Sequence, residues 1–378
     1  MKNRNAKGGG SVRQREDGTW EARCTINGKR RSFYGDRQSD ALKAMRTALA
    51  AADNGSFIEP SKMTVGAWLE LWLEEYIKPS TKPLTYAAYK SSIETHIKPY
   101  LGSVRLSALN PTQVQSFYNH LLREKKLSAK TIKNNHGILH KALDQAMRLR
   151  YIGFNVTDAC TVPRVEKKEI QPLTEEEITA FLETASGDEY EDMLIVALFT
   201  GMRRGELCGL AWDAVNFRTG KITVKQQLYA SREDYTYKIA STKSDRIRVL
   251  AAPQFVLDIL SRVRKEQALN QLKCPFTWEN EHNLVFTTET GRHIAPVTLY
   301  THFKRIAKKI GRPDARFHDL RHTYAVTALQ EGDDVKTVQQ NLGHATASFT
   351  LDIYGHVSEK MKRDSANRMQ QYFNKIKA

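Results

Sequence analysis

The chain has 378 residues, and its 58 Lys and Arg against 42 Asp and Glu give a formal net charge of +16. At about 150 residues per domain, this length predicts two or three domains. The longest uninterrupted apolar run, Met193–Phe199, is far shorter than the roughly 20 residues of a membrane span, so we expect neither a membrane helix nor a secretory signal. The four cysteines are far apart in the sequence, which argues against a disulfide framework and a cysteine zinc site and is typical of a cytoplasmic protein.

The positive charge is concentrated in the first 165 residues. Residues 1–60 carry a net charge of +5 and residues 61–165 carry +8, whereas the rest of the chain carries only +3. Such a distribution indicates a polyanionic partner. Of the two candidates, nucleic acid and an anionic membrane surface, it favours nucleic acid.

Residues 11–52 predict a small β-sheet covered by one helix. The strands alternate apolar and polar residues, and Asn27-Gly28 is a strong hairpin signal between the last two. A helix with Ser39 as its N-cap follows and would cover the apolar face. The expected strands and helix are Ser11–Arg15, Thr19–Ile26, Lys29–Tyr34 and Ser39–Ala52.

The opposite face of this sheet is predicted to be basic. Arg23 lies on it, and four more side chains are candidates to join it: Arg13, Arg15, Lys29 and Arg31. Because a small sheet can enter the major groove, we assign these five residues to DNA binding. The alternative is a small fold whose cationic face is merely solvated.

From Thr64 to about Arg150 the spacing of apolar residues is helical. Thr64, Asn110 and Ser128 are the expected N-caps of three of the helices. A further helix is expected over Leu84–Tyr100. Four helices that carry a net charge of +8 would form a DNA-binding module. Its aromatic residues fall on the apolar stripes of the helices, which indicates that they belong to the core.

A new domain is predicted to start at Thr174, after a linker over Cys160–Glu169. Thr174 begins a capping-box pattern, and helices then alternate with short strands. The strands are expected at Lys221–Gln226, in a basic hairpin over Lys243–Leu250 and at Leu284–Thr287. The tail, Ser358–Ala378, is predicted to be a helix whose apolar residues fit either its own domain or a neighbouring subunit.

Four clusters in this last domain carry side chains suited to phosphate chemistry. Arginine binds phosphate with a planar fork, imidazole and ammonium groups move protons, and a tyrosine hydroxyl supplies a nucleophile. Each cluster alone has an ordinary structural explanation, and a zinc site at His318 and His322 is disfavoured because Asp319 stands where the metalloprotease signature has glutamate. The clusters are Thr200–Leu207, Thr242–Ser244, His318–Thr323, and Leu342–His344 with Tyr354–His356.

In their order and spacing, the clusters resemble those of the tyrosine recombinases, specifically the integrases of temperate phages and conjugative transposons. The resemblance covers about residues 64–378, and the basic sheet is similar to the arm-binding domain of conjugative-transposon integrases. It implies Glu206 as a supporting carboxylate and Tyr354 as the nucleophile. The full catalytic set that it implies is Arg203, Lys243, His318, Arg321, His344 and Tyr354.

The resemblance also implies a multidomain fold. An N-terminal three-stranded β-sheet plus helix would be followed by an all-α helical-bundle domain and a mainly α (α+β) catalytic domain. The expected domains are an arm-type DNA-binding domain over 1–56, a core-site DNA-binding domain over 63–160, and a catalytic domain with a C-terminal protomer-exchange helix over 170–378.

The same resemblance implies a reaction and its partners. Such enzymes cleave and rejoin double-stranded DNA through a covalent 3′-phosphotyrosine without a metal or cofactor, and so integrate and excise a mobile element. They assemble as homotetramers on core and arm sites, and an excisionase and a host DNA-bending protein are further partners that the resemblance allows. The expected location is the cytoplasm, at the nucleoid, with no membrane partner.

Three other functions are less favoured. A type IB topoisomerase would use the same chemistry without strand exchange, and the separate basic sheet, which suits a second class of DNA site, argues against it. A DNA-binding regulator would have no use for the ordered catalytic set, and a chromosome-dimer resolvase would not need the separate basic sheet.

Overall fold

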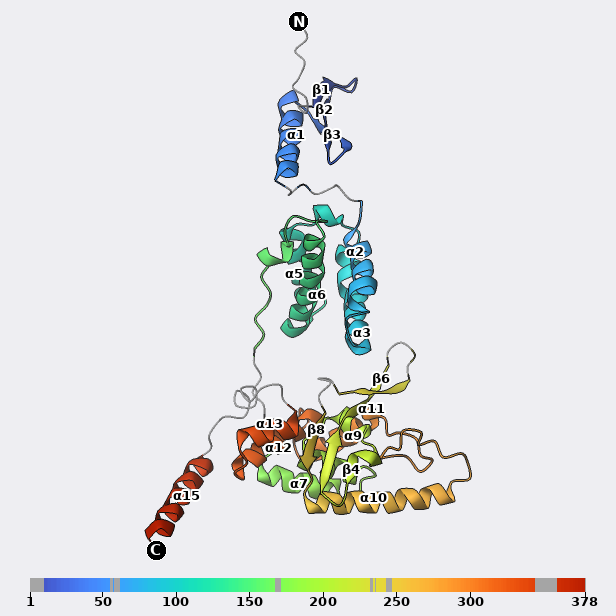
Figure 1. Cartoon of the computed structure of the whole chain (residues 1–378), viewed down its shortest axis with the longest axis vertical. Helices are drawn as coiled ribbons and strands as arrows, with labels where there is room; N and C mark the ends of the chain where they lie inside the picture. The colour runs from blue at the N-terminus through green and yellow to red at the C-terminus, as the bar shows by residue number, and fades with distance from the viewer. Residues whose placement is uncertain are drawn as a thin grey trace. The chain divides into compact units, whose positions relative to one another are not determined.

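The structure is a computed structural model that describes residues 10–54, 57, 62–166, 171–231, 234, 236–242, 247–343 and 359–377 (Figure 1). The chain divides into two compact units, residues 1–166 and 167–378. The first unit holds two separate hydrophobic cores, one under a small sheet and one among helices. The fold class predicted from the sequence is confirmed.

The first core lies between a three-stranded antiparallel sheet and one helix (Figure 1). Its buried residues include Ala22, Cys24 and Met45, so the alternation in the sequence correctly identified the apolar face. The predicted cap at Ser39 is wrong, because the helix starts one residue earlier and its N-cap residue makes no side-chain cap bond. The elements are β1 (Ser11–Gln14), β2 (Trp20–Ile26), β3 (Lys29–Gly35) and α1 (Gln38–Asp53).

The second core is formed by helices from residue 65 onward. The Thr64, Asn110 and Ser128 side chains each accept a backbone N–H of the helix they begin, which confirms all three predicted caps. The helix expected over Leu84–Tyr100 is continuous, with a π-turn at Ile93–Ile97. The elements are α2 (Val65–Trp72), a π-turn (Leu73–Ile77), α3 (Pro83–Ser92), α4 (Lys98–Leu101), α5 (Pro111–Arg123) and α6 (Ala129–Arg148).

The second unit places helices around a three-stranded sheet of order β4-β5-β8 and a separate β6-β7 hairpin (Figure 1). The predicted capping box of Thr174 and Glu177 is confirmed. Its helices are α7 (Glu175–Ala185), α8 (Glu191–Thr200), α9 (Arg204–Cys208), α10 (Gln254–Lys273), α11 (Pro296–Lys309), α12 (Phe317–Gln330), α13 (Val335–Leu342) and α15 (Glu359–Lys377). Its strands are β4 (Val215–Asn216), β5 (Lys221–Val224), β6 (Gln226–Ala230), β7 (Tyr237–Ser241) and β8 (Arg248–Ala251).

Two strand predictions in this unit need correction. Leu284–Thr287 forms no strand, and only isolated bridges, Ala211 to Leu284 and Thr287 to His293, occur there. Of the hairpin expected over Lys243–Leu250, residues 243–246 lie outside the described residues, and the described part does not pair with the strand that precedes it. β7 pairs with β6, and β8 pairs with β5.

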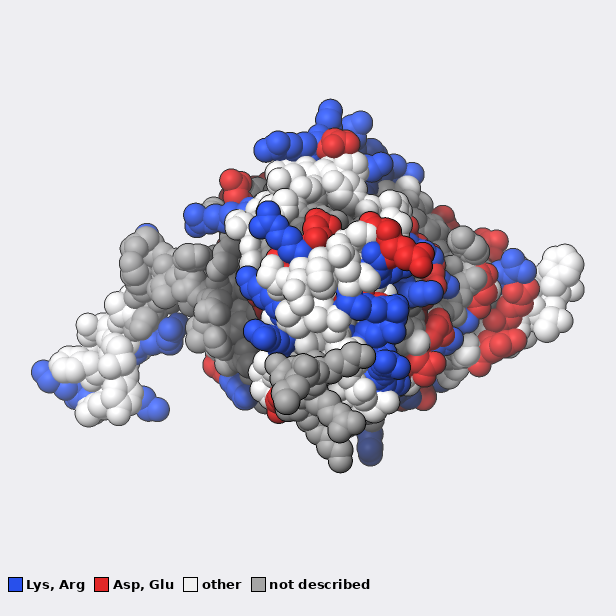
Figure 2. Space-filling model, turned by 90° about the horizontal axis from the view of Figure 1, so that it is seen from above, with Lys and Arg blue, Asp and Glu red and all other residues white. Residues whose placement is uncertain are grey.

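On the face of the molecule that Figure 2 shows, Lys and Arg side chains lie among Asp and Glu side chains. Within the described ranges, no helix has the length and hydrophobicity needed to cross a membrane.

Candidate active site

The turn between α8 and α9 fixes the position of Arg203. Gly201 ends α8 in the left-handed conformation, with φ of 61°, and a Cβ there would lie 2.7 Å from side-chain atoms of Leu342 and Tyr324. Both the backbone conformation and the close contact require glycine. Two residues later, Arg203 is the N-cap of α9, with 28% of its side chain exposed.

Glu206 is buried beneath Arg203. It is 1% exposed, and its Oε1 accepts a hydrogen bond from Arg203 Nη1 at 2.8 Å while its Oε2 accepts the Arg203 backbone N–H at 2.9 Å. Arg248 donates from Nη1 and Nη2 to the same two oxygens at 3.0 and 2.6 Å. Burial alone would raise the pKa of Glu206, but the hydrogen bonds and charge of Arg248, followed by the charge of Arg203, lower it to about 2.

Arg321 joins two segments that are far apart in the sequence. It lies on α12, is 1% exposed, and donates from Nη1 to the Gly201 carbonyl at 2.8 Å and from Nη2 to the Leu342 carbonyl. These bonds hold the end of α8 against the end of α13. The guanidinium thereby keeps a fixed positive charge beside the turn that leads to Arg203.

His318 lies one turn before Arg321 on α12. Its ring meets the His322 ring edge to face, with centroids 4.7 Å apart. The atoms packed around His318, and then the positive charges of His322, Arg321 and Arg203, lower its pKa to about 4, although the residue is solvent-exposed. Because Arg321 bonds to the Gly201 carbonyl, two residues before Arg203, this end of α12 lies beside the turn that carries Arg203.

The other three predicted catalytic residues, Lys243, His344 and Tyr354, lie outside the described residues. Two described residues near them in the sequence lie close to Glu206 or to its partner Arg248. β8 contributes Arg248, which follows Lys243 in the sequence, and Gly343 precedes His344 and ends α13 against the Arg248 side chain.

The second unit is matched over residues 171–361 by the family model described as the phage integrase family. The chain belongs to the phage integrase family of tyrosine recombinases. A second model, the N-terminal SAM-like domain of phage integrases, matches residues 64–122. The resemblance inferred from the sequence is therefore confirmed.

Individual relatives support the same family. The protein named tyrosine recombinase XerC-like from Caldanaerobacter subterraneus subsp. tengcongensis is 30% identical over 369 residues, covering 92% of this chain and 93% of that protein. The putative prophage phiRv2 integrase of Mycobacterium tuberculosis is 27% identical and covers 80% of this chain and 76% of its own. The Tn1549 transposon integrase in complex with a circular intermediate DNA has a similar fold, with a TM-score of 0.69 and 24% identity over 81% of this chain and 99% of that one.

The sequence analysis places Arg248 only within a basic hairpin and does not predict that it belongs to the site. In the structure its side chain is 7% exposed. The alternation of the strand does indicate that Arg248 is buried. Leu250 is buried on β8, and a residue two positions earlier lies on the same face of the strand.

The strand register of the N-terminal sheet divides the predicted DNA-binding residues. Arg31 pairs with Cys24 and Lys29 pairs with Ile26, so both lie on the face that α1 covers. The prediction that they join the open face is wrong. Arg30, which pairs with Thr25, lies on the open face and was missed.

The open face carries Arg13 and Arg23 around a buried carboxylate. Arg13 Nε and Arg23 Nη2 each lie 2.8 Å from Oε2 of Glu21. The bond from Arg23, then that from Arg13, lowers the pKa of Glu21 to about 2. Arg15 lies over the Tyr34 ring, 5.5 Å from its centroid. Glu21 therefore orients two arginines, and DNA contact by this face stays a prediction.

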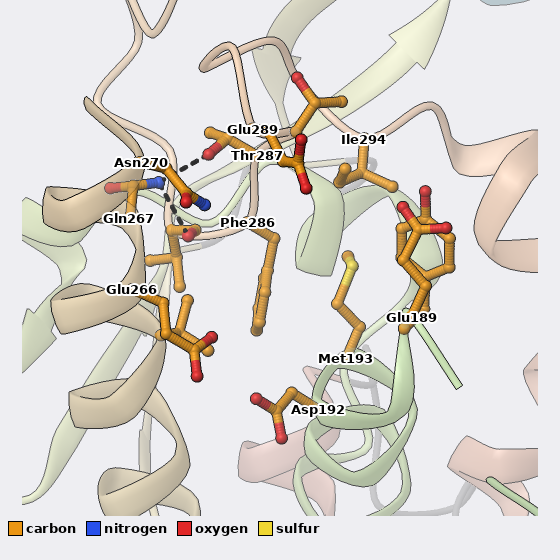
Figure 3. A pocket seen from close by; sticks show the side chains of 14 residues that line it. Glu189, Asp192, Met193, Glu266, Gln267, Asn270, Phe286, Thr287, Glu289 and Ile294 are labelled. Atoms are coloured by element: carbon orange, nitrogen blue, oxygen red, sulfur yellow. Dashed lines mark hydrogen bonds between the residues drawn. The ribbon is translucent and has the colours of Figure 1, made fainter. Parts of the chain in front are cut away.

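A cavity of about 200 Å³ lies between α8, α10 and residues 285–294 (Figure 3). Gln267 borders it and donates to the Thr287 hydroxyl at 2.9 Å. The negative side chains around this cavity disfavour phosphate binding. The candidate site for DNA chemistry is therefore the opposite end of α8, where Arg203 lies. The carboxylates that line it are Glu189, Asp192, Glu266 and Glu289.

Acidification should destabilise the protein through His318 and His322. Burial, then the charges of Arg316 and Arg321, lowers the pKa of His322 to about 4 despite the opposing charge of Asp319, and the pKa of the solvent-exposed His318 is also lowered to about 4, whereas the ordinary value is 6.5. The unfolded chain therefore binds these protons first, and stability that is present above pH 6.5 is lost as the pH falls towards 4. Histidine hydrogen–deuterium exchange on the full-length protein measures both pKa values, with the denatured protein as control. Values near 6.5 in the folded protein would contradict this assignment.

Proposed function

We propose that the protein is a site-specific recombinase that cleaves and rejoins DNA through a covalent 3′-phosphotyrosine at Tyr354. The observation that carries the proposal is the Arg321–Gly201 hydrogen bond, which brings Arg321 and, one turn before it, His318 to the turn where the buried Glu206 holds Arg203. Arginine and imidazole side chains at one site match the requirements of phosphoryl transfer.

The reaction begins when the Tyr354 hydroxyl oxygen attacks the scissile phosphorus. His318 accepts the hydroxyl proton, which requires a neutral imidazole, and its lowered pKa of about 4 provides one at neutral pH. The bond from phosphorus to the 5′ oxygen breaks, and that oxygen takes a proton from Lys243. The 3′ phosphate stays on Tyr354 until another 5′ hydroxyl reverses these steps. Each step exchanges one phosphoester bond for another, so rejoining needs no ATP.

Negative charge on the transition state is stabilised by Arg203, Arg321 and His344. Arg203 can reach the phosphate because part of its side chain is exposed. Arg321 is buried and contributes a fixed positive charge, and Glu206 orients Arg203.

The other regions position the DNA. Residues 1–56 bind arm sites through the open face of the sheet, residues 63–160 bind core sites, and residues 170–378 catalyse the reaction. In this proposal α15 docks on a neighbouring protomer, because its apolar side chains are exposed. These are Met369, Tyr372, Phe373 and Ile376, with exposed fractions of 66, 61, 51 and 66%.

The element that is moved is a mobile one, integrated and excised at attachment sites. A prophage integrase and a transposon integrase among the similar proteins support this step. The separate basic sheet supports it too, since a second class of DNA site has a use in integration and none in simple DNA relaxation.

Covalent capture tests the proposal. Full-length protein is incubated in EDTA with a pool of nicked duplexes of randomised sequence, and covalent protein–DNA adducts should be visible on a denaturing gel. They accumulate because the short strand that carries the new 5′ hydroxyl diffuses away before it can be rejoined. Mass spectrometry should find the oligonucleotide on the peptide that contains Tyr354. Tyr354→Phe, which lacks only the hydroxyl, is the control.

An adduct on another residue, or one formed by Tyr354→Phe, would contradict the mechanism. Sequence-independent relaxation of a plasmid with no recombinant products would instead indicate a topoisomerase.

A further inference from the structure

Arg248 is a buried cation with three directed hydrogen bonds. Its Nη1 and Nη2 hold both oxygens of Glu206 at 3.0 and 2.6 Å, and its Nε donates to the Asn341 carbonyl at 2.8 Å. A guanidinium that uses both ends of its fork on one carboxylate has little freedom to rotate. Only 7% of its side chain is exposed, so it does not present its charge to DNA as a surface residue would.

These bonds connect three segments that are separate in the sequence. Glu206 lies on α9 and holds Arg203, Arg248 begins β8 just after Lys243, and Asn341 lies at the end of α13, just before His344. Gly343 closes the contact, because a Cβ at this position would lie 2.9 Å from Arg248 Cδ.

We propose that Arg248 is a positioning residue that, through Glu206, aligns Arg203 with the start of β8 and the end of α13. This inference rests on the proposed function. Arg248 touches no reacting atom in this proposal and acts through Glu206 and the end of α13.

The electrostatics around Glu206 support this role. Two cations bond the carboxylate, Arg203 at the start of its own helix and Arg248 on β8, and a third, Lys225, lines a small gap that Glu206 also lines. Lys225 is already paired with Asp213 at 2.7 Å. Without Arg248, burial would dominate and the pKa of Glu206 would rise, so its bond to Arg203 would weaken on acidification.

Single-turnover cleavage of the duplex captured most strongly from the nicked pool tests the proposal. Arg248→Met should cleave about 10- to 100-fold more slowly than the wild type, as is usual when a supporting partner of a reactive group is lost. Arg248→Lys should recover part of the rate, since it restores the charge but not the fork. Arg262→Met is the matched control, because it removes an exposed arginine paired with Asp192 near the opposite end of α8.

Two further readouts separate positioning from simple loss of stability. The rate of Arg248→Met should fall more steeply than that of the wild type between pH 8 and pH 6, because Glu206 becomes protonated. Adding Glu206→Gln should remove this additional pH dependence and raise the melting temperature, since no buried carboxylate is left with only one of its two arginine partners, while the rate stays low. A merely structural role would lower the rate by one factor at every pH.

The outcomes distinguish this inference from the proposed function. If the wild type formed no adduct with any duplex, the proposed function would fail. If the wild type formed an adduct, and Arg248→Met measured below its melting temperature had the same rate and pH profile as the wild type, the positioning role would be overturned. A slower rate caused entirely by weaker DNA binding would also overturn it, because Arg248 would then be a DNA contact.

Discussion

Arg203→Met should reduce the rate of strand cleavage by about 10²–10³-fold, equivalent to about 2.7–4 kcal/mol of transition-state stabilisation. The fold should tolerate this change well. Arg203 keeps 28% of its side chain exposed, and Glu206 retains both bonds from Arg248. The free energy of unfolding should therefore fall by only about 1.5–3 kcal/mol, the contribution of one hydrogen bond to a charged group.

Arg321→Met should lose as much cleavage and much more stability. Arg321 is 1% exposed, and its removal leaves the carbonyls of Gly201 and Leu342 without these donors. Each buried carbonyl left unsatisfied costs roughly 1–3 kcal/mol. Chemical denaturation and single-turnover cleavage of the two variants measure the contrast.

Near-wild-type cleavage by either variant would contradict the assignment of the site. Equal destabilisation of the two would contradict the different burial of the two arginines.

Local signals in the sequence predicted local structure well. Thr64, Asn110, Ser128 and Thr174 all cap helices as predicted, because an N-cap depends only on a side chain and the next three residues. Ser39 is the exception. Its hydroxyl lies 3.4 Å from the Asp40 carboxylate and does not cap α1, which starts one residue earlier.

The facing of Lys29 and Arg31 could have been predicted from the turn. A two-residue Asn27-Gly28 turn makes Ile26 and Lys29 direct partners, and direct partners share a face of the sheet. Since Ile26 is apolar and buried, Lys29 and Arg31 had to lie on the covered side. The charge of these residues indicated DNA binding, but charge carries no information about strand register.

The position of Arg248 required tertiary structure. Its partners, Glu206 and Asn341, are 42 and 93 residues away in the sequence, so no local pattern joins them. The failed strand at Leu284–Thr287 has a related cause. A short apolar run indicates burial, and whether a neighbouring strand is available to pair with it is decided elsewhere in the chain.

Trp68→Ala should cause the largest loss of stability in the first unit. Trp68 is fully buried, its ring centroid lies 5.3 Å from that of Tyr151, and its Nε1 donates to the Ala142 carbonyl at 2.8 Å. Truncating a buried tryptophan costs about 3–5 kcal/mol, and the loss of the Nε1 hydrogen bond to a carbonyl that keeps its helical bond adds roughly 0.5–1.5 kcal/mol. That loss approaches the whole stability of a typical domain, about 5–15 kcal/mol.

Calorimetry of the full-length protein should therefore show a much lower unfolding temperature for the helical region. The unfolding temperature of residues 167–378 should stay unchanged. Trp68→Phe keeps most of the ring area and removes only the N–H donor, so it should cost much less than Trp68→Ala. If both variants melted like the wild type, the second core would not depend on this ring. Equal, large losses would mean that the hydrogen bond to Ala142, rather than packing, holds α2 against α6.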